Sequence, residues 1–168
     1  MTDMIVPLMH LDYQPDQKLI DDGFVIRRAH IVDKKKILDF VSANFNRSAS
    51  WMAETEMGLH QSPPTVFVAS KGQQIVGFSC YNTTGKGFFG PVGVDPAFRG
   101  LNLGKELLLV GLDGLKNDGY AYGIIGWVSG TKFYADQCGA IEIPGSEPQN
   151  SIYANVLSQR EVPVAAGS

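Results

Sequence analysis

The sequence predicts a domain of the α/β (α+β) class. Runs rich in β-branched and aromatic residues alternate with segments whose apolar residues recur every three or four positions, a pattern typical of strands alternating with helices. The 168 residues are 44% hydrophobic and 18% charged, which is enough to bury one substantial core but short for two. We therefore expect a single domain over residues 1–168.

The N-terminal half is expected to contain three strands and one helix. In order, the predicted segments are an N-terminal extension over 1–22, a strand over 24–29, a helix capped by Asp33, an irregular stretch around Trp51, and a hairpin of strands over 65–69 and 74–82. The extension shows no clear period, and it ends in the turn Asp21-Asp22-Gly23. The helix is predicted from the three- and four-residue spacing of Ile37, Phe40, Val41 and Phe45.

The C-terminal half is expected to contain four strands and two helices. In order, they are a strand over 88–94, a leucine-rich helix over 103–115, a strand over 120–128, a short helix over 131–137, and strands over 140–143 and 152–157, before a loose tail over 163–168. The strand over 88–94 contains Gly90, Pro91 and Gly93, which are poor residues for a regular ladder. We therefore expect it to bulge or to lose pairing there.

Charge and composition exclude several classes of protein. The net charge of -3 and the pI near 5.5 give no basic surface of the kind that binds phosphate backbones, so nucleic acid is not an expected partner. No apolar run approaches the ~20 residues that span a bilayer. Cys80 and Cys138 form no paired motif, and no signal peptide precedes them, so we expect free thiols and a cytoplasmic location. The histidines and cysteines have no metal-ligand spacing, so no metal is expected.

The segment from Val92 to Lys105 is the most informative part of the chain. It is predicted to contain the end of a strand, a tight loop with small residues and the start of a helix. The N-terminus of a helix presents unpaired N–H groups and a partial positive charge, and glycines let a phosphate approach the backbone. The spacing of Gly100, Gly104 and Lys105 matches neither a Walker A loop nor a Rossmann fingerprint. The segment therefore indicates a pyrophosphate site of another kind.

This segment resembles the hallmark of the GNAT acetyltransferases. Arg99-Gly100-Leu101-Asn102-Leu103-Gly104 matches the family pattern of Arg or Gln, two residues, Gly, one residue, and Gly or Ala, with Asn102 in place of the first hallmark glycine. Asn tolerates left-handed backbone better than other non-glycine residues, so the loop is expected to keep its shape. The order of elements from about Phe24 to Leu157 also resembles the family. The amino-acid sequences of three segments resemble a bacterial subgroup of the family most. These segments are Gly90 to Val94, Gly119 to Tyr122 and Ile143 to Ser146.

The resemblance implies the GNAT fold, a mixed sheet of six or seven strands with a splayed central strand and flanking helices. It also implies acetyl-CoA as cosubstrate. The backbone of Val92 and Val94 would line the pantetheine arm, with the Val92 N–H as the oxyanion donor. The residues implied to hold the pyrophosphate through their backbone amides are Arg99, Gly100, Asn102, Leu103, Gly104 and Lys105. Many family members dimerise, so the resemblance also allows a homodimer.

The resemblance assigns the role of general acid to Tyr134. It matches the family tyrosine that protonates the departing CoA thiolate, and a phenol with a pKa near ~10 stays protonated at neutral pH. No family base transfers, because the position used by some relatives is Phe88 here. Trp51, Glu54 and Glu56 fall in the region that shapes the acceptor pocket in the family. The two carboxylates are candidates to bind an ammonium group or to relay its proton through water, and the alternative is that both are ordinary solvated carboxylates of a helix.

Three functions remain open from the sequence. The first is acetyl transfer from acetyl-CoA to a primary amine by direct attack in a ternary complex, with a small molecule as the favoured acceptor because the chain is acidic. The second is an N-acetyltransferase of proteins or peptides. The third is an acyl-CoA-binding module without catalytic activity.

Overall fold

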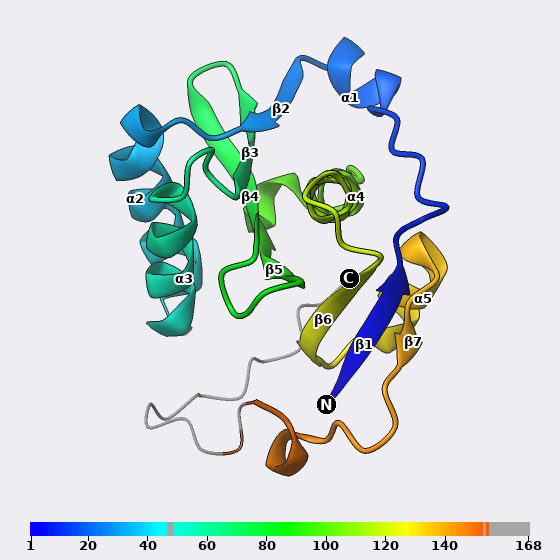
Figure 1. Ribbon diagram of the computed structural model, residues 1–168. Coiled ribbons are helices and arrows are strands. Elements are labelled where there is room, and N and C mark those ends of the chain that lie inside the picture. The colour runs from blue at the N-terminus through cyan, green and yellow to red at the C-terminus, as the bar shows by residue number, and fades with distance from the viewer. Residues whose placement is uncertain (47–48, 153, 155–168) are drawn as a thin grey trace.

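A computed structural model describes residues 1–46, 49–152 and 154 (Figure 1). Its strands are β1 (Thr2–Pro7), β2 (Phe24–Arg28), β3 (Val66–Lys71), β4 (Gln74–Tyr81), β5 (Phe88–Val94), β6 (Tyr122–Val128) and β7 (Ile141–Glu142). Its α-helices are α1 (Gln17–Asp21), α2 (Lys34–Phe45), α3 (Ala49–Leu59), α4 (Leu103–Asn117) and α5 (Thr131–Cys138). There are also three short 3-10 helices: η1 (Ile31–Asp33) after β2, η2 (Pro96–Phe98) after β5 and η3 (Pro148–Asn150) after β7.

The seven strands form one mixed sheet in the order β2-β3-β4-β5-β6-β1-β7. Neighbouring strands from β2 to β5 are antiparallel, and β5 and β6 are parallel. Helices flank the sheet, with α2 and α3 on one side of β3 and β4 and α4 on the other (Figure 1). The predicted fold class, a mixed sheet of six or seven strands with flanking helices, is confirmed.

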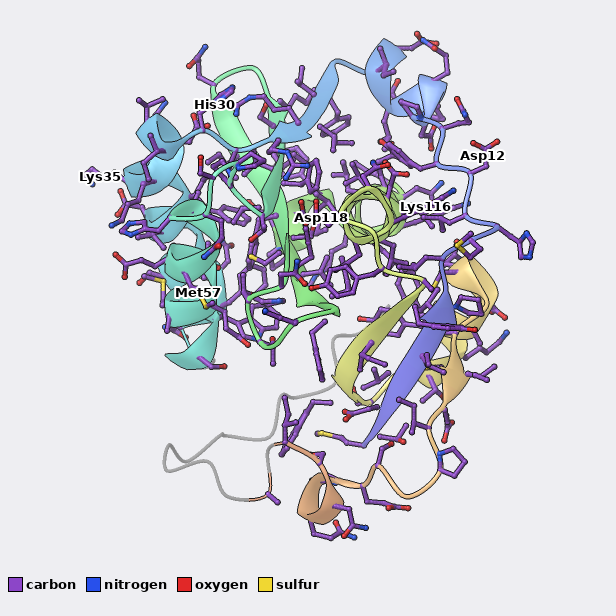
Figure 2. All side chains as sticks on the ribbon, in the orientation of Figure 1. Asp12, His30, Lys35, Met57, Lys116 and Asp118 are labelled. Carbon is purple, nitrogen blue, oxygen red and sulfur yellow. The ribbon has the colours of Figure 1, made fainter. Side chains whose placement is uncertain are left out.

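The first strand lies inside the sheet rather than outside it. β1 pairs antiparallel with β6 on one side, where Thr2 is opposite Val128, and with β7 on the other. The expectation of an N-terminal extension over residues 1–22 was therefore wrong. Because the partner strands of β1 are far away in the sequence, no local periodicity of apolar residues marked this segment as a strand. After β1 the chain crosses α4, where Lys116 Nζ donates a hydrogen bond to the Leu11 carbonyl; Lys116 and the neighbouring Asp12 are labelled in Figure 2.

The central strand β5 is both bulged and splayed. In its pairing with β4, Ser79 is opposite Val92 and Tyr81 is opposite Phe89, so two residues of β5 face one of β4 and the register shifts at Gly90-Pro91. Its pairing with β6 covers only Phe88 with Ile124 and Phe89 with Ile125. The predicted irregularity is confirmed, and we call the separation of β5 and β6 beyond Phe89 and Ile125 the splay.

Two apolar clusters pack on opposite faces of the sheet. In β3, Phe67 belongs to one cluster and its neighbours Val66 and Val68 to the other, as alternating side chains require. The α4 cluster contains the leucines of α4, of which Leu107, Leu108, Leu112 and Leu115 are fully buried. The α2-α3 cluster contains Ile37, Phe40, Val41 and Phe78. The sheet thus separates an α4 face from an α2-α3 face.

Most other predicted elements are confirmed within a few residues, but the helices α1 and α3 were missed. The stretch around Trp51 forms the helix α3 and is not irregular. The helix α1 was not predicted. Of the strand predicted over 152–157, Ile152 lies in a turn, while residues 153 and 155–157, like the predicted tail over 163–168, lie outside the described residues. Among the helices that the structure describes, none is long and apolar enough to cross a bilayer.

Candidate functional site

The loop between β5 and α4 is held in a defined shape by its own side chains and backbone. Asp95 Oδ1 accepts a 2.9 Å hydrogen bond from the Ala97 amide and so begins η2. The chain then turns through Gly100, with φ +79°, and Asn102, with φ 67° and ψ 8°, before α4 starts at Leu103. Asn102 therefore adopts the left-handed conformation expected of the residue in a hallmark glycine position.

Backbone amides converge at the start of α4. The amides of Leu103, Gly104 and Lys105 belong to the first turn, where an α-helix offers them no carbonyl partner. Within the described part of the chain, no backbone carbonyl accepts from the amides of Gly100 or Asn102. The backbone amides that the resemblance assigns to the pyrophosphate thus lie together at this turn. The Arg99 amide differs from the others because it already has a carbonyl partner, Pro96, to which it donates at 3.5 Å.

The space over this turn is open. A Cβ atom added at Gly100 would meet nothing within 4 Å, and one added at Gly104 would meet only Val94 Cγ2, at 3.9 Å. The side chains of Arg99 and Lys105 are exposed beside it. A helix N-terminus with free N–H groups, open space and two nearby cations suits an anion such as a pyrophosphate.

The amides of Val92 and Val94 point toward the splay. The Asp95 amide donates to the Val76 carbonyl at 2.8 Å, so this pair is hydrogen-bonded across β4 and β5. Because bonded and non-bonded pairs alternate in an antiparallel ladder, the pairs Gly77 with Val94 and Ser79 with Val92 are non-bonded. The N–H groups of Val92 and Val94 therefore face β6, and the β5–β6 pairing has already ended at Phe89. Both donors are available to a group lying in the splay.

Tyr134 lies on α5, which follows the splayed end of β6. Its ring packs against the α4 cluster and meets Phe133 edge-on, with 5.1 Å between ring centroids. Burial raises the pKa of Tyr134 to about 12, and the nearby Cys138 adds to the rise. Among the described residues, none is hydrogen-bonded to the Tyr134 hydroxyl. The group is thus a protonated donor at neutral pH.

Comparison with known proteins decides the family. The model of the acetyltransferase (GNAT) family matches residues 35–140, more than half of the chain. The chain belongs to the GNAT acetyltransferase family. This membership agrees with the resemblance found in its sequence. A search of curated proteins gave no match.

Solved structures share the GNAT fold at low sequence identity. A glucosamine N-acetyltransferase region of a fungal multi-domain β-N-acetylglucosaminidase superposes with a TM-score of 0.68 at 15% identity, over 84% of this chain and 19% of that one. A GCN5-related N-acetyltransferase from Sphaerobacter thermophilus gives 0.58 at 20% identity, over 88% and 44%. A GNAT acetyltransferase from Brucella melitensis in complex with acetyl-CoA gives 0.54 at 21%, over 76% and 93%. The chain thus spans less than half of the first two proteins.

The α2-α3 face of the GNAT sheet has aromatic residues beside the central strand. Phe45 contacts Trp51 with 5.1 Å between ring centroids, and a Cβ atom at Gly93 of β5 would lie 2.5 Å from Phe45 Cζ. The ring of Phe45 therefore lies between Trp51 and β5, the strand that carries Val92. On the same helix, Glu54 Oε1 accepts a 2.5 Å hydrogen bond from Thr84 Oγ1.

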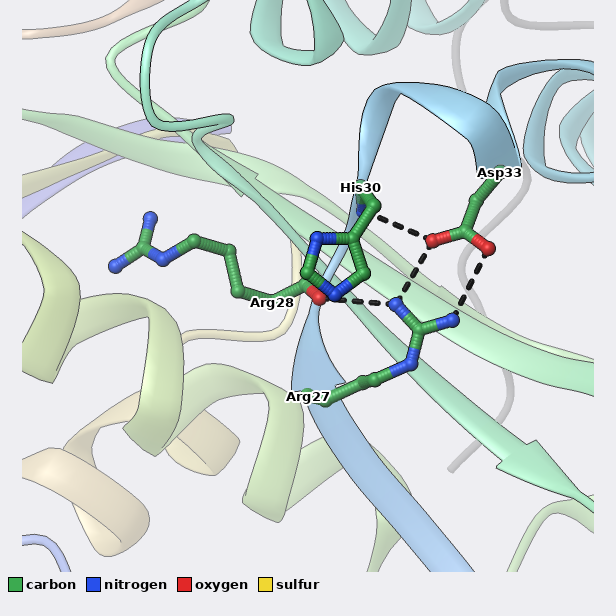
Figure 3. A network of polar contacts seen from close by, with 4 residues as sticks. All are labelled: Arg27, Arg28, His30 and Asp33. Carbon is green, nitrogen blue, oxygen red and sulfur yellow. Dashed lines mark hydrogen bonds and ion pairs between the residues drawn. The ribbon is translucent and has the colours of Figure 1, made fainter.

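Two histidines near the start of α2 and the end of α3 lie among polar contacts of their own. The His30 amide donates to Asp33, which also forms a bidentate ion pair with Arg27, at the outer end of β2 (Figure 3). His60 Nε2 lies 2.9 Å from Lys34 Nζ, which pairs with Glu56. Over the residues that the structure describes, no group of three or more His, Cys, Asp or Glu could hold a metal. The contact of Thr84 with Glu54 was not predicted, because it joins a loop to a distant helix.

Proposed function

We propose that this GNAT protein transfers the acetyl group of acetyl-CoA to a primary amine by direct attack in a ternary complex, and that the acceptor is a small molecule. The pyrophosphate of CoA would bind the amides of Gly100, Asn102, Leu103, Gly104 and Lys105. Arg99 would contribute its side chain, since its amide is turned toward Pro96. The left-handed backbone at Asn102 and the open space over Gly104 support this assignment.

The orientation of the Val92 amide carries the proposal. With the acyl arm lying in the splay, the Val94 backbone would bind the pantetheine and the Val92 N–H would donate to the thioester carbonyl oxygen. Negative charge develops on that oxygen when the amine attacks, and a donor already fixed in the strand needs no reorganisation. Val92 is fixed in this way because it lies opposite Ser79 in the ladder with β4.

Tyr134 would protonate the leaving thiolate. The attack forms the C–N bond, the C–S bond breaks, and its electron pair leaves on sulfur. A thiol has a pKa near ~8.5, so a thiolate is a weaker base than a phenolate, and proton transfer from Tyr134 is uphill by a few pKa units. The phenolate formed in this way is therefore short-lived, and it regains a proton from solvent after CoA leaves. The pKa of Tyr134, raised to about 12, ensures that the proton is present before the reaction.

The acceptor would bind on the α2-α3 face, beside Trp51 and Glu54. An aromatic ring and a carboxylate together suit a cationic amine. The net charge of -3 attracts small cations over a longer range. These features favour a small amine over a peptide, which would need an extended groove.

Calorimetric titration with acetyl-CoA tests the cosubstrate site. Wild type is compared with Gly104→Glu, whose carboxylate would crowd and repel the pyrophosphate, and with Gly104→Ala as the matched control. The nearest atom to a Cβ at this position is 3.9 Å away, so both variants should fold. We expect binding by wild type and Gly104→Ala and none by Gly104→Glu.

A panel of acceptors then tests the reaction. Glucosamine, agmatine, spermidine and lysine-containing peptides are each incubated with acetyl-CoA, and release of free CoA thiol is followed. Turnover of small amines supports the proposal. Turnover of peptides alone would show that the acceptor is a protein or peptide, and binding of acetyl-CoA with no turnover on a broad panel would show a non-catalytic module.

A further inference from the structure

Glu54 and Thr84 form a hydrogen-bonded pair between two elements that are distant in sequence. Glu54 lies on α3, and Thr84 lies in the loop that joins β4 to β5. Thr84 Oγ1 donates to Glu54 Oε1 at 2.5 Å, and both residues are partly buried. A short hydrogen bond to a carboxylate fixes the direction of the hydroxyl proton, which points at Glu54. The lone pairs of Thr84 Oγ1 then remain to accept another proton.

The loop that carries Thr84 is held against β5. Thr83 Oγ1 donates to the Gly90 carbonyl at 3.1 Å, and the Asn82 amide donates to the Phe88 carbonyl at 2.8 Å. Within the loop, Asn82 Oδ1 accepts from the Gly87 amide at 2.8 Å. Gly90 precedes Val92 by two residues in the same strand. The loop that carries Thr84 is therefore fixed to β5 next to the proposed oxyanion donor.

The pair is on the side from which an acceptor would approach. Glu54 belongs to α3, which packs on the α2-α3 face, whereas the phosphate-binding turn begins α4 on the other face. Beyond Phe89 and Ile125 the splay separates β5 from β6, so that groups on the two faces can meet. An acyl group entering from the α4 face would meet an amine that approaches from the α2-α3 face.

We infer that Thr84 accepts the proton of the attacking amine and passes its own hydroxyl proton to Glu54. The neutral amine forms the C–N bond with the thioester carbonyl carbon. One N–H proton moves to Thr84 Oγ1 as the hydroxyl proton moves to Glu54 Oε1, while the sulfur leaves and takes the proton of Tyr134. Proton exchange with solvent then resets Glu54 and Tyr134. Thr84 is the catalytic residue of this relay and Glu54 is its positioning residue, and the assignment rests on the proposed acetyl transfer.

The test compares variants with the panel amine that wild type acetylates fastest. Glu54→Gln and Thr84→Val each break the relay, and Thr84→Ser keeps the hydroxyl. Glu56→Gln is the matched control, because Glu56 is an exposed carboxylate on the same helix that pairs with Lys34. We expect kcat to fall about 100-fold in Glu54→Gln and in Thr84→Val, with the KM for acetyl-CoA unchanged. Thr84→Ser should restore most of the rate, and Glu56→Gln should match wild type.

The double variant Glu54→Gln/Thr84→Val distinguishes a relay from two independent effects. Residues that act in series are not additive, so its kcat should equal that of the slower single variant. Additive losses, or a Thr84→Ser variant as slow as Thr84→Val, would overturn the relay and leave a pair that only ties α3 to the loop. Unchanged kcat in Glu54→Gln would overturn it while the acetyl transfer stands. Failure of wild type to acetylate any amine would overturn both.

Discussion

The carboxylate of Asp3, in the first strand, accepts a 2.8 Å hydrogen bond from the backbone amide of Trp127, near the end of β6. Trp127 has φ 57°, a left-handed conformation, at the point where the register of β1 against β6 shifts. Asp3 is buried, and its own amide donates to Ser146 Oγ at 2.9 Å. Through its carboxylate and its backbone amide, Asp3 thus joins the end of β6, beside the splay, to the segment that follows β7.

Replacing Asp3 by Ala should destabilise the protein. The Trp127 amide would lose its partner, and an unsatisfied, partly buried donor costs about 1–3 kcal/mol. Asp3→Asn keeps a carbonyl oxygen that can accept the same hydrogen bond, so it should lose less. Urea unfolding of the three proteins measures the difference. Equal midpoints for wild type and Asp3→Ala would contradict this account.

Replacing Asn102 separates the effect of backbone conformation from that of the side chain. Because φ at Asn102 is 67°, Asn102→Gly should fold normally and bind acetyl-CoA at least as well as wild type. Asn102→Val places a β-branched residue in left-handed backbone, at a cost of about 1–2 kcal/mol, and should weaken acetyl-CoA binding as the turn moves. Calorimetry and thermal melting of both variants give the result. Equal binding by the Val and Gly variants would show that the turn does not depend on this conformation.

Removing the Tyr134 hydroxyl should affect turnover and leave binding intact. Tyr134→Phe keeps the ring that packs against the α4 cluster. With an amine that wild type acetylates, kcat should fall about 100-fold, because the thiolate would leave without a proton donor. The affinity for acetyl-CoA, measured by calorimetry, should remain that of wild type. An unchanged kcat would exclude Tyr134 as the general acid.

The raised pKa of Tyr134 also predicts how stability depends on pH. The unfolded chain loses this proton near pH ~10, whereas the folded chain, with a pKa of about 12, keeps it. The stabilisation is therefore fully present below pH 10 and is lost as the pH rises toward 12. Burial and its hydrogen bond to Glu106 also raise the pKa of Tyr13, so that residue adds a loss of the same sign. The unfolding midpoint of Tyr134→Phe should fall less steeply between pH 10 and 12 than that of wild type.

Contact between Gly93 and Phe45 should make the central strand intolerant of a side chain. A methyl group at Gly93 would lie 2.5 Å from Phe45 Cζ, so Gly93→Ala should lower the free energy of unfolding by about 1–3 kcal/mol. Adding Phe45→Leu should recover part of that loss. Urea unfolding of the single and double variants measures the coupling. Additive losses would show that the two positions do not contact.

Local patterns predicted the elements whose determinants are local. The strand over Phe88–Val94 and the helix from Leu103 were predicted from a run of β-prone residues and from leucine spacing, and the bulge was predicted from Gly90 and Pro91. The left-handed turn at Asn102 was expected from the family resemblance, which places a glycine there, together with the tolerance of Asn for this conformation. Such features depend on a few neighbouring residues, which the sequence displays directly.

Features that depend on distant contacts were missed. β1 has Asp3 and Pro7 among its apolar residues, and only its pairing with β6 and β7 makes it an interior strand. In α3, the apolar residues do not gather on one face, so periodicity gave no signal. The significance of Thr84 comes from Glu54, thirty positions away on another element. The family resemblance, rather than residue spacing, assigned the roles to Val92 and Tyr134.

The interior position of β1 has a consequence for how the protein is made. β1 is made before the other six described strands, yet its partners β6 and β7 are complete only when synthesis has passed Val128 and Glu142. The strands β2 to β5, by contrast, can pair in the order in which they emerge. Met4 and Val6, which are buried in the finished sheet, therefore lack their partner strands until β6 and β7 have been made. Closure of the sheet around β1 is therefore a late step of folding, and until then β1 is an unpaired strand of the kind that can aggregate.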